Sequence, residues 1–283
     1  MILAPGEAPA EPFFLERANG QRYCLFHPPV GACRGALLYV HPFGEEMNRS
    51  RRMAALQARE LAALGYGVLQ LDLYGCGDSS GDFGDARWDL WLQDLAASAA
   101  WLRQRLGQPI TLWGLRLGAL LALDYARAAP HPVAAIILWQ PVASGAVHLT
   151  QFLRLRMAGE LLADGAGQPA GTATLRAALQ AGEVLEVGGY DLAPELAASI
   201  DALDAATLAP TNCPVHWFEA VGGASRALPP GAERIAAGWR AQGVDLHVNV
   251  VHCPPFWSTP EVTVCPALLA STSAVFRAVS HAV

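Results

Sequence analysis

The segment Gly114-Leu115-Arg116-Leu117-Gly118 places a charged side chain between two glycines at an abrupt change of pattern. The run 109–113 before it is short, apolar and partly β-branched, which predicts a strand, and the leucine- and alanine-rich run 117–123 predicts a helix. A sharp strand-to-helix turn of this kind commonly presents a nucleophilic side chain. Arg116 cannot act as one, because its guanidinium stays protonated and has no lone pair to offer.

Two roles for Arg116 remain open from the sequence. A guanidinium offers five N–H donors in one plane and is suited to binding a carboxylate or a phosphate. An arginine buried at this turn without a partner would lose several kcal/mol of solvation, so the protein itself could neutralise it. Glu45 and Glu46 lie shortly after the predicted strand 35–40. We expect either an ion pair from Arg116 to Glu45 or Glu46, or a ligand anion bound to Arg116.

Two other residues could take part in proton transfer. His252 follows the predicted strand 244–251, and an imidazole with an ordinary pKa of about 6.5 suits proton transfer at neutral pH. Glu219, at the end of the predicted strand 214–219, is the sole carboxylate in its segment. The alternative for His252 is a histidine that is merely hydrogen-bonded at a strand end.

Cysteines and serines near these segments are possible substitutes for a missing nucleophile. A thiolate with a lowered pKa would be a good nucleophile, and Cys76 and Cys253 are the candidates, although neither is favoured. Ser79 and Ser80 are interpreted as turn or capping residues. The six cysteines are scattered without a CxxC pair and are expected to be free thiols. No His, Cys or carboxylate spacing indicates a metal site.

Strand-like and helix-like segments alternate along the chain, which predicts a mostly parallel sheet covered by helices on both faces. The predicted strands cover 23–27, 35–40, 67–73, 109–113, 133–139, 214–219 and 244–251, and the predicted helices cover 53–64, 85–106, 117–123, 232–241 and 267–279. Residues 144–207 interrupt the alternation with helical pieces and are interpreted as a helical lid. We therefore expect one domain over residues 1–283, with the lid inserted within it.

Composition and charge exclude several classes of protein. The chain has 283 residues, 53% of them hydrophobic, and a net charge of −6 without a cluster of lysine and arginine beside aromatic residues, so nucleic-acid binding is not expected. No apolar stretch reaches the ~20 residues that span a bilayer. The N-terminal segment lacks the pattern of a secretory signal, which predicts a cytoplasmic protein.

Three segments together resemble the α/β-hydrolases, most specifically the exosortase-A-system-associated hydrolases. They are His41-Pro42-Phe43-Gly44-Glu45-Glu46-Met47-Asn48, Asp72-Leu73-Tyr74-Gly75-Cys76-Gly77-Asp78-Ser79 and Gly114-Leu115-Arg116-Leu117-Gly118. The resemblance implies the α/β-hydrolase fold, a general base at His252, and oxyanion-hole N–H groups near Phe43 and Leu117. The chain departs from the family's Ser-His-Asp pattern, because Arg116 stands at the nucleophile position and Glu219 stands before the usual place of the acid.

These features lead to one expected function and one competitor. The preferred hypothesis is an atypical acyl hydrolase for an ester or thioester, in which Arg116 and the oxyanion N–H groups bind the ligand and His252 activates water. The competitor is a catalytically inactive relative that binds an anionic or acyl ligand, or a protein partner, in a system that exports or decorates surface material. Neither hypothesis requires a cofactor.

Overall fold

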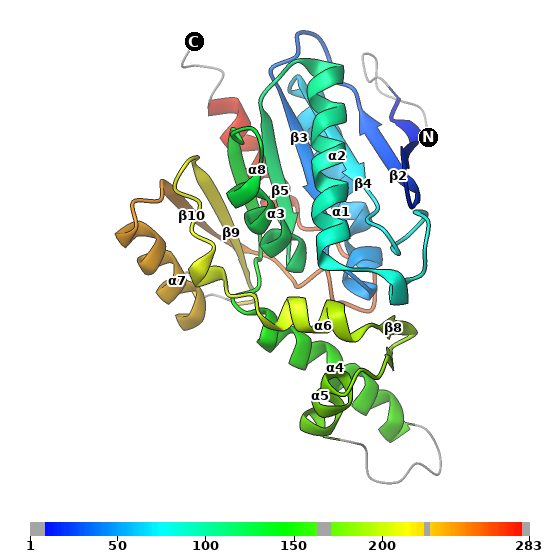
Figure 1. Ribbon diagram of the computed structural model, residues 1–283. Coiled ribbons are helices and arrows are strands. Elements are labelled where there is room, and N and C mark those ends of the chain that lie inside the picture. The colour runs from blue at the N-terminus through cyan, green and yellow to red at the C-terminus, as the bar shows by residue number, and fades with distance from the viewer. Residues whose placement is uncertain (1–8, 163–170, 224–226, 279–283) are drawn as a thin grey trace.

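A computed structural model describes residues 9–162, 171–223 and 227–278. An eight-stranded sheet with the order β1-β2-β4-β3-β5-β6-β9-β10 forms its centre (Figure 1). β1 and β2 pair antiparallel, as do β2 and β4, and all other neighbours run parallel. The sheet strands are β1 (Glu11–Arg17), β2 (Gly20–His27), β3 (Gly35–Val40), β4 (Tyr66–Leu71), β5 (Ile110–Leu115), β6 (Ala135–Trp139), β9 (Val215–Val221) and β10 (Leu246–His252).

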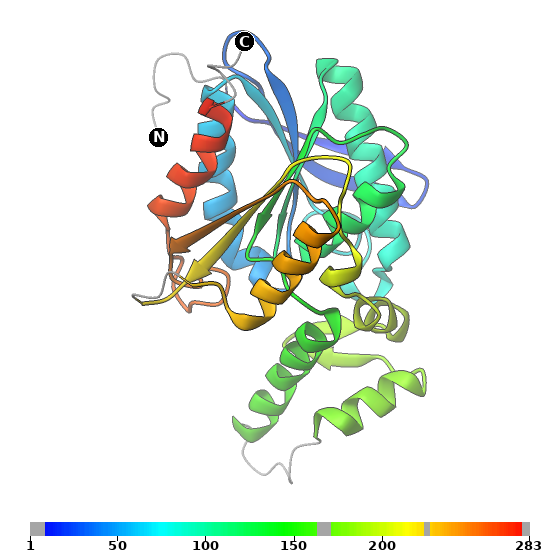
Figure 2. The same cartoon turned by 90° about the vertical axis from the view of Figure 1, so that its left-hand side faces the viewer.

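Helices cover both faces of the sheet, as the alternation predicts (Figures 1 and 2). The central strands β3 and β5 are buried along their whole length, which explains why both read as apolar runs. One hydrophobic core lies under α2 (Trp88–Leu106), α3 (Leu117–Ala128) and α7 (Pro230–Ala241), and a second lies under α1 (Glu45–Ala63) and α8 (Pro266–Ala278). The expected α/β-hydrolase fold is confirmed.

Several predicted boundaries were wrong for local reasons. The helix predicted at 53–64 is α1 and begins at Glu45, so the two candidate glutamates lie in its first turn. The helix predicted at 85–106 is α2 and begins at Trp88, because a 3-10 turn closed by an Asp82–Asp85 capping box occupies Phe83–Asp85. β1 was not predicted, and it extends the sheet by pairing with β2.

The segment between β6 and β9 lies beyond the carboxyl ends of the parallel strands. It contains α4 (Gly145–Leu162), α5 (Thr172–Gln180), a hairpin of β7 (Leu185–Val187) and β8 (Tyr190–Leu192), α6 (Pro194–Asp201) and the 3-10 turn Ala205–Thr207. Figure 2 shows α4, α5 and α6 together at one end of the sheet. Within this segment the sequence has a glycine-rich stretch at 165–171, of which only Gly171 belongs to the described residues. This end of the sheet, at the carboxyl ends of the parallel strands, is also where α1 and α3 begin, so α4 lies near the first turns of both helices.

Candidate functional site

The turn between β5 and α3 has the sharp geometry that its two glycines predict. Arg116 caps α3 with φ 55° and ψ −120°, a conformation that costs an L-residue about 1–3 kcal/mol. A Cβ on Gly118 would lie 2.3 Å from the carbonyl oxygen of Val40, and one on Gly114 would lie 2.5 Å from the Cα of Ala119. The glycines therefore let α3 pass against β3 and β5, and this close packing holds Arg116 in its strained conformation.

The side chain of Arg116 is neutralised by the protein. Its Nε donates to Oε1 of Glu46 at 3.1 Å, and its guanidinium carbon lies 5.3 Å from the ring centre of Trp257. Only 14% of the Arg116 side chain and 21% of the Glu46 side chain are exposed. Burial raises the pKa of Glu46, and the charge of Arg116 opposes that shift. Of the two alternatives left by the sequence, the structure contains the internal ion pair.

Glu45 does not join this pair, although it precedes Glu46 in the first turn of α1. Its Oε1 accepts a hydrogen bond from the Tyr190 hydroxyl at 2.9 Å, and its Oε2 lies 4.0 Å from the Nε of Arg49. Glu45 therefore links α1 to the hairpin strand β8. The two neighbouring glutamates have separate partners and cannot be exchanged for one another.

The expected oxyanion-hole residues lie together. Phe43 and Leu117 both line a small void of about 10 Å³ at the start of α3. Among the described residues, the backbone N–H groups of Phe43 and Leu117 donate to no backbone carbonyl. Two such donors at a helix N-terminus favour a carbonyl oxygen or a negative charge. Phe43 and Leu117 therefore lie near one another beside the turn that carries Arg116, and their role as oxyanion donors stays a prediction.

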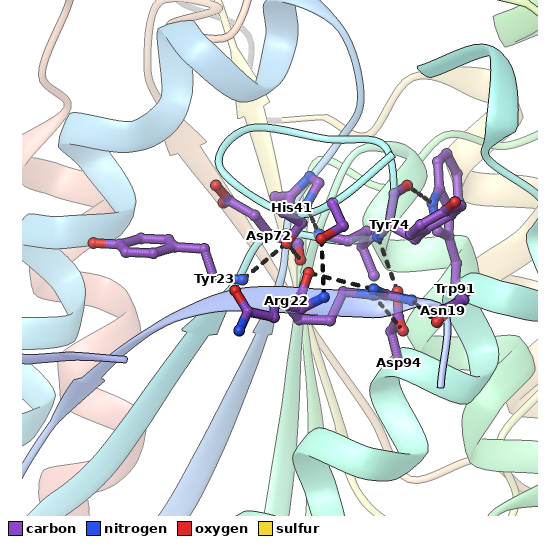
Figure 3. A network of polar contacts seen from close by, with 12 residues as sticks. Asn19, Arg22, Tyr23, His41, Asp72, Tyr74, Trp91 and Asp94 are labelled. Carbon is purple, nitrogen blue, oxygen red and sulfur yellow. Dashed lines mark hydrogen bonds and ion pairs between the residues drawn. The ribbon is translucent and has the colours of Figure 1, made fainter. Parts of the chain in front are cut away.

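The turn that carries Phe43 is held by a buried polar network (Figure 3). Nδ1 of His41 donates to the carbonyl oxygen of Pro42 at 2.5 Å, and its Nε2 accepts from the backbone N–H of Leu73 at 3.0 Å. Burial lowers the pKa of His41, which keeps the ring neutral and able to accept. His41 is therefore a positioning residue that joins the loops after β3 and β4.

The loop after β4 is fixed by a second part of the same network. Asp94 of α2 accepts from Nε of Arg22 at 2.8 Å and from the backbone N–H of Tyr74 at 2.9 Å (Figure 3). Arg22 and Asp94 are each 1% exposed, and the guanidinium of Arg22 also lies over the Tyr74 ring at 4.5 Å. This buried ion pair holds the edge of the site but does not contact the cavity described below.

Glu219 is a structural carboxylate in this structure. It is 3% exposed and accepts from the indole N–H of Trp217 at 2.8 Å and from the side-chain amide of Gln140 at 2.9 Å. Gln140 has φ 43°, and its Oε1 accepts from the backbone N–H of Ala220 at 2.6 Å. Burial raises the pKa of Glu219. These contacts tie the end of β6 to β9 and occupy both oxygens of the carboxylate.

His252 is at the end of β10, as predicted, but its side chain is exposed and has no hydrogen-bond partner among the described residues. Its strand neighbour is Val221, and its carbonyl oxygen accepts from the thiol of Cys265 at 3.7 Å. The structure does not bring His252, Glu219 and Arg116 together into a hydrogen-bonded relay. The described residues offer its ring no hydrogen-bond partner, so both interpretations of His252, as a general base and as a histidine hydrogen-bonded at a strand end, stay predictions.

His148, which no sequence motif singled out, lines the site from α4. It is 7% exposed, its ring meets that of Phe43 edge-on at 5.5 Å, and its buried Nδ1 has no hydrogen-bond partner among the described residues. Burial, followed by the nearby charge of Arg116, lowers the pKa of His148 to about 3. The helical spacing of His148 and Phe152 on one apolar face was the available signal. A neutral, unpartnered imidazole thus lies across from the ion pair.

A cavity of about 290 Å³ lies between α1, α4 and the loop after β10, and we call it the elbow pocket. Its walls are apolar and aromatic with a few charged groups, a composition typical of small-molecule sites. The lining residues are Phe43, Glu45, Glu46, Arg49, His148, Gln151, Phe152, Leu155, Trp257 and Ser258.

A larger cavity of about 490 Å³ lies between α1, β2 and β4. Its main charged groups pair with one another, because Arg51 donates to both oxygens of Asp72 at 3.2 and 3.0 Å. Asp72 also accepts from the backbone N–H of Asp78 at 3.0 Å. The elbow pocket is the better candidate site, since it adjoins the strained turn and contains unpaired polar atoms.

The substitute nucleophiles are not activated. Cys76 and Cys253 are buried; burial raises the pKa of the Cys76 thiol, and a hydrogen bond with Cys265 followed by burial raises that of Cys253. The Ser79 hydroxyl donates to the carbonyl oxygen of Asp72 at 2.5 Å, and the Ser80 hydroxyl accepts from the backbone of β2.

The described residues contain no cluster of three or more metal-binding side chains, and none of their helices has the length and apolar character needed to cross a membrane.

Comparisons with known proteins agree with this architecture. Residues 31–235 match the profile of the family described as serine aminopeptidase, S33. Est1E from Butyrivibrio proteoclasticus with bound ferulic acid superposes with a TM-score of 0.63 at 15% identity, covering 95% of this chain and 97% of that one. A monoglyceride lipase from Saccharomyces cerevisiae with a substrate analogue gives 0.63 at 17% identity, covering 95% of each chain.

A third structure, the mouse alpha/beta hydrolase domain-containing protein 10, gives a TM-score of 0.58 at 15% identity and covers 96% of this chain and 99% of that one. No curated protein matches the sequence significantly. At these low identities the structural matches support the fold, and the family profile supports the classification.

Proposed function

Because the chain belongs to the serine aminopeptidase S33 family of α/β-hydrolases, we propose that its ligand site is the elbow pocket, where it binds an acyl compound without forming an acyl-enzyme. The observation that carries the proposal is the Arg116 side chain. It occupies the sharp turn after β5, is held by Glu46, and offers a cation where covalent catalysis needs a nucleophile.

The polar groups around Arg116 suit a bound carbonyl or carboxyl group. Phe43 lines both the elbow pocket and the small void that it shares with Leu117, and the N–H groups of these two residues can donate to an acyl oxygen. Arg116 does not line the elbow pocket itself, but it contacts two residues that do, Glu46 and Trp257. The Glu46 contact leaves both terminal nitrogens of the Arg116 guanidinium as further donors. The rings of Phe152 and Trp257 provide apolar surface for the rest of the ligand. The site therefore supports recognition of an acyl group without any step that breaks its bond.

The segment 144–207 is proposed to act as the lid of this pocket within a single domain of residues 1–283. Support comes from α4, which contributes His148, Gln151, Phe152 and Leu155 to the pocket wall. Tyr190 of β8 extends this contact by donating to Glu45 on α1. A movement of α4 would change the size of the pocket and the access of ligand to Arg116.

The competing proposal is the residual hydrolase in which His252 activates water. The family match favours hydrolysis in general. The position of His252 does not favour it, because this residue is exposed and does not line the elbow pocket. The three sequence segments resemble proteins of a system that exports or decorates surface material. A role in such a system is compatible with both the binding proposal and the hydrolase proposal.

Parallel binding and turnover assays separate the two proposals. Octanamide binding is measured by calorimetry, and hydrolysis of p-nitrophenyl octanoate is measured in wild type, Arg116→Ser and His252→Ala. We expect wild type to bind octanamide and to hydrolyse the ester no faster than buffer does, with His252→Ala behaving like wild type. Ester turnover in wild type that is lost in His252→Ala would favour the hydrolase, and absence of octanamide binding would contradict the proposed site.

A serine-directed fluorophosphonate provides a second readout of the same proposal. Wild type is expected to remain unlabelled, since Ser79 and Ser80 are held in turn hydrogen bonds. Arg116→Ser places a hydroxyl at the turn beside the N–H groups of Phe43 and Leu117. Labelling of wild type at Ser79 or Ser80 would show that a nucleophile has been overlooked.

A further inference from the structure

Two buried polar atoms of residues lining the elbow pocket lack hydrogen-bond partners within the described part of the chain. Glu46 uses Oε1 for Arg116, and its Oε2 is buried without a donor. Nδ1 of His148, in a side chain that is 7% exposed, is also buried without a partner. Buried polar atoms are nearly always paired, and an unpaired one costs about 1–3 kcal/mol. Both atoms belong to residues that line the elbow pocket, so a ligand bound there or an added proton can supply a missing partner once these side chains adjust.

The charges at the pocket are balanced before any ligand binds. Ionised Glu45 and Glu46 are matched by Arg49 and Arg116, and His148 is neutral. A ligand carboxylate bound to Arg116 would add a negative charge beside the carboxylate of Glu46. Two carboxyl groups at one site cannot both remain ionised without a large cost, so one of them takes up a proton.

We propose that the elbow pocket binds apolar monocarboxylates together with one proton, which is taken up by Glu46 so that Arg116 can pair with the ligand carboxylate. The inference rests on the proposed binding function and specifies its ligand and its regulation. Protonated Glu46 no longer requires Arg116 as a counterion, and its new O–H can donate to the ligand or to His148. Burial of Glu46, which raises its pKa, favours this protonation.

The groups that face Glu46 leave it as the residue that takes up the proton. Arg116 stays charged, and His148 stays neutral because its pKa is about 3. Glu45 is bonded to Tyr190, whose pKa is raised to about 12 by burial and by that glutamate. The other polar side chains of the pocket wall are of types that do not titrate near neutral pH. They are Arg49, Gln151, Trp257 and Ser258.

The size and lining of the pocket limit the ligand to a compact apolar acid. A volume of about 290 Å³ lies just below the ~300–1,000 Å³ found for small-molecule pockets. Phe43, Phe152, Leu155 and Trp257 surround the space next to the ion pair. Octanoate is a suitable probe, and octanamide has the same tail with an uncharged head that needs no proton.

The test is calorimetric titration of octanoate and octanamide into wild type between pH 6 and 8, where octanoate is ionised because carboxylic acids titrate at about 4–5. Linked uptake of one proton predicts that octanoate affinity falls by up to about tenfold for each unit of rising pH, while octanamide affinity stays flat. Titrations in two buffers with different ionisation enthalpies are expected to show uptake of one proton per octanoate and none per octanamide.

Glu46→Gln is the decisive variant, because it keeps the shape of the side chain and removes the titrating carboxyl. We expect it to bind octanoate with no dependence on pH and at least tenfold more tightly than wild type at pH 8. Glu233→Gln on the exposed surface of α7 controls for the removal of one negative charge, and His252→Ala controls for an exposed imidazole. Both controls are expected to keep the wild-type pH dependence.

The possible results separate this inference from the proposed function. If octanamide binds while octanoate fails to bind or binds without proton uptake, the proton-linked mechanism is wrong and the acyl site stands. Retention of the pH dependence in Glu46→Gln would also overturn the mechanism. If neither ligand binds, the proposed function fails together with the inference.

Discussion

Removal of the Arg116 side chain tests the ion pair that defines the site. In Arg116→Ala, Glu46 loses its one donor, and its Oε2 already has none. Breaking a fully buried pair costs about 3–5 kcal/mol, and because these side chains are 14% and 21% exposed we expect a smaller loss of about 1–3 kcal/mol at pH 8. Arg116→Gly is expected to be about 1 kcal/mol more stable than Arg116→Ala, since glycine adopts φ 55° without strain.

The loss in Arg116→Ala depends on pH with a definite sign. Burial holds the pKa of Glu46 in the folded chain above its ordinary 4.5, so its contribution to stability is full below pH 4.5 and is lost as pH rises through the raised value. Without Arg116 the pKa of Glu46 rises further. The stability difference between wild type and Arg116→Ala therefore grows with pH and shrinks as pH falls toward 4.5.

Urea unfolding at pH 5 and pH 8 measures this difference, and a double-mutant cycle with Glu46→Gln isolates the pair. We expect a coupling energy of about 1–2 kcal/mol at pH 8 and less at pH 5. Arg105→Ala, which breaks the exposed pair with Glu11 at 3.4 Å, is the control and is expected to change stability by less than about 1 kcal/mol. A coupling energy of zero at pH 8, or a loss that is equal at both pH values, would refute this account of Arg116 and Glu46.

Three further predictions concern the frame of the site. Asp94→Ala is expected to lower the free energy of unfolding by about 3–5 kcal/mol, since it leaves Arg22 charged and 1% exposed; a loss below about 1 kcal/mol in urea unfolding would contradict the buried pair. Gly118→Ala is expected to lower the free energy of unfolding by at least about 2 kcal/mol, because the new Cβ would lie 2.3 Å from a carbonyl oxygen of β3. Its control, Gly238→Ala, has open space around the new Cβ in α7 and is expected to raise the free energy of unfolding by about 0.5–1 kcal/mol. Equal effects of the two substitutions would argue against the close contact between α3 and β3. One thiol per native chain is expected to react rapidly with a disulfide reagent, because Cys33 is partly exposed and the other cysteines are buried; a rapid reaction that persists in Cys33→Ser would contradict that burial.

The fold was predictable where the sequence carried a strong periodic or glycine signal. The apolar runs of β3 and β5 and the paired glycines around Arg116 led to the central sheet and its sharp turn. β1 escaped prediction because Glu11–Arg17 has exposed and half-buried positions and joins the sheet through its pairing with β2. The early start of α1 escaped because its first turn is polar, with Gly44 as a cap that has no side chain.

The site was predictable only in part, because its key contacts join distant segments. The sequence led to Arg116 and to two candidate partners, Glu45 and Glu46. Which of the two pairs with Arg116 depends on the direction in which the first turn of α1 faces, and this direction places Glu46 against Arg116. His148 lies in the segment 144–207, where its helical spacing with Phe152 marks a buried face but does not distinguish a functional residue from a core residue. Glu219 and His252 have the expected places in the chain, yet hydrogen bonds to Trp217 and Gln140 hold the first, and the second is exposed.

Intact-mass spectrometry of wild type mixed with p-nitrophenyl octanoate detects any covalent bond between the protein and the acyl group. If Arg116 occupies the nucleophile position, we expect an unmodified mass at every time from milliseconds to minutes, under conditions where octanamide binds the same sample. An octanoyl adduct on a serine, threonine or cysteine of wild type would contradict this expectation.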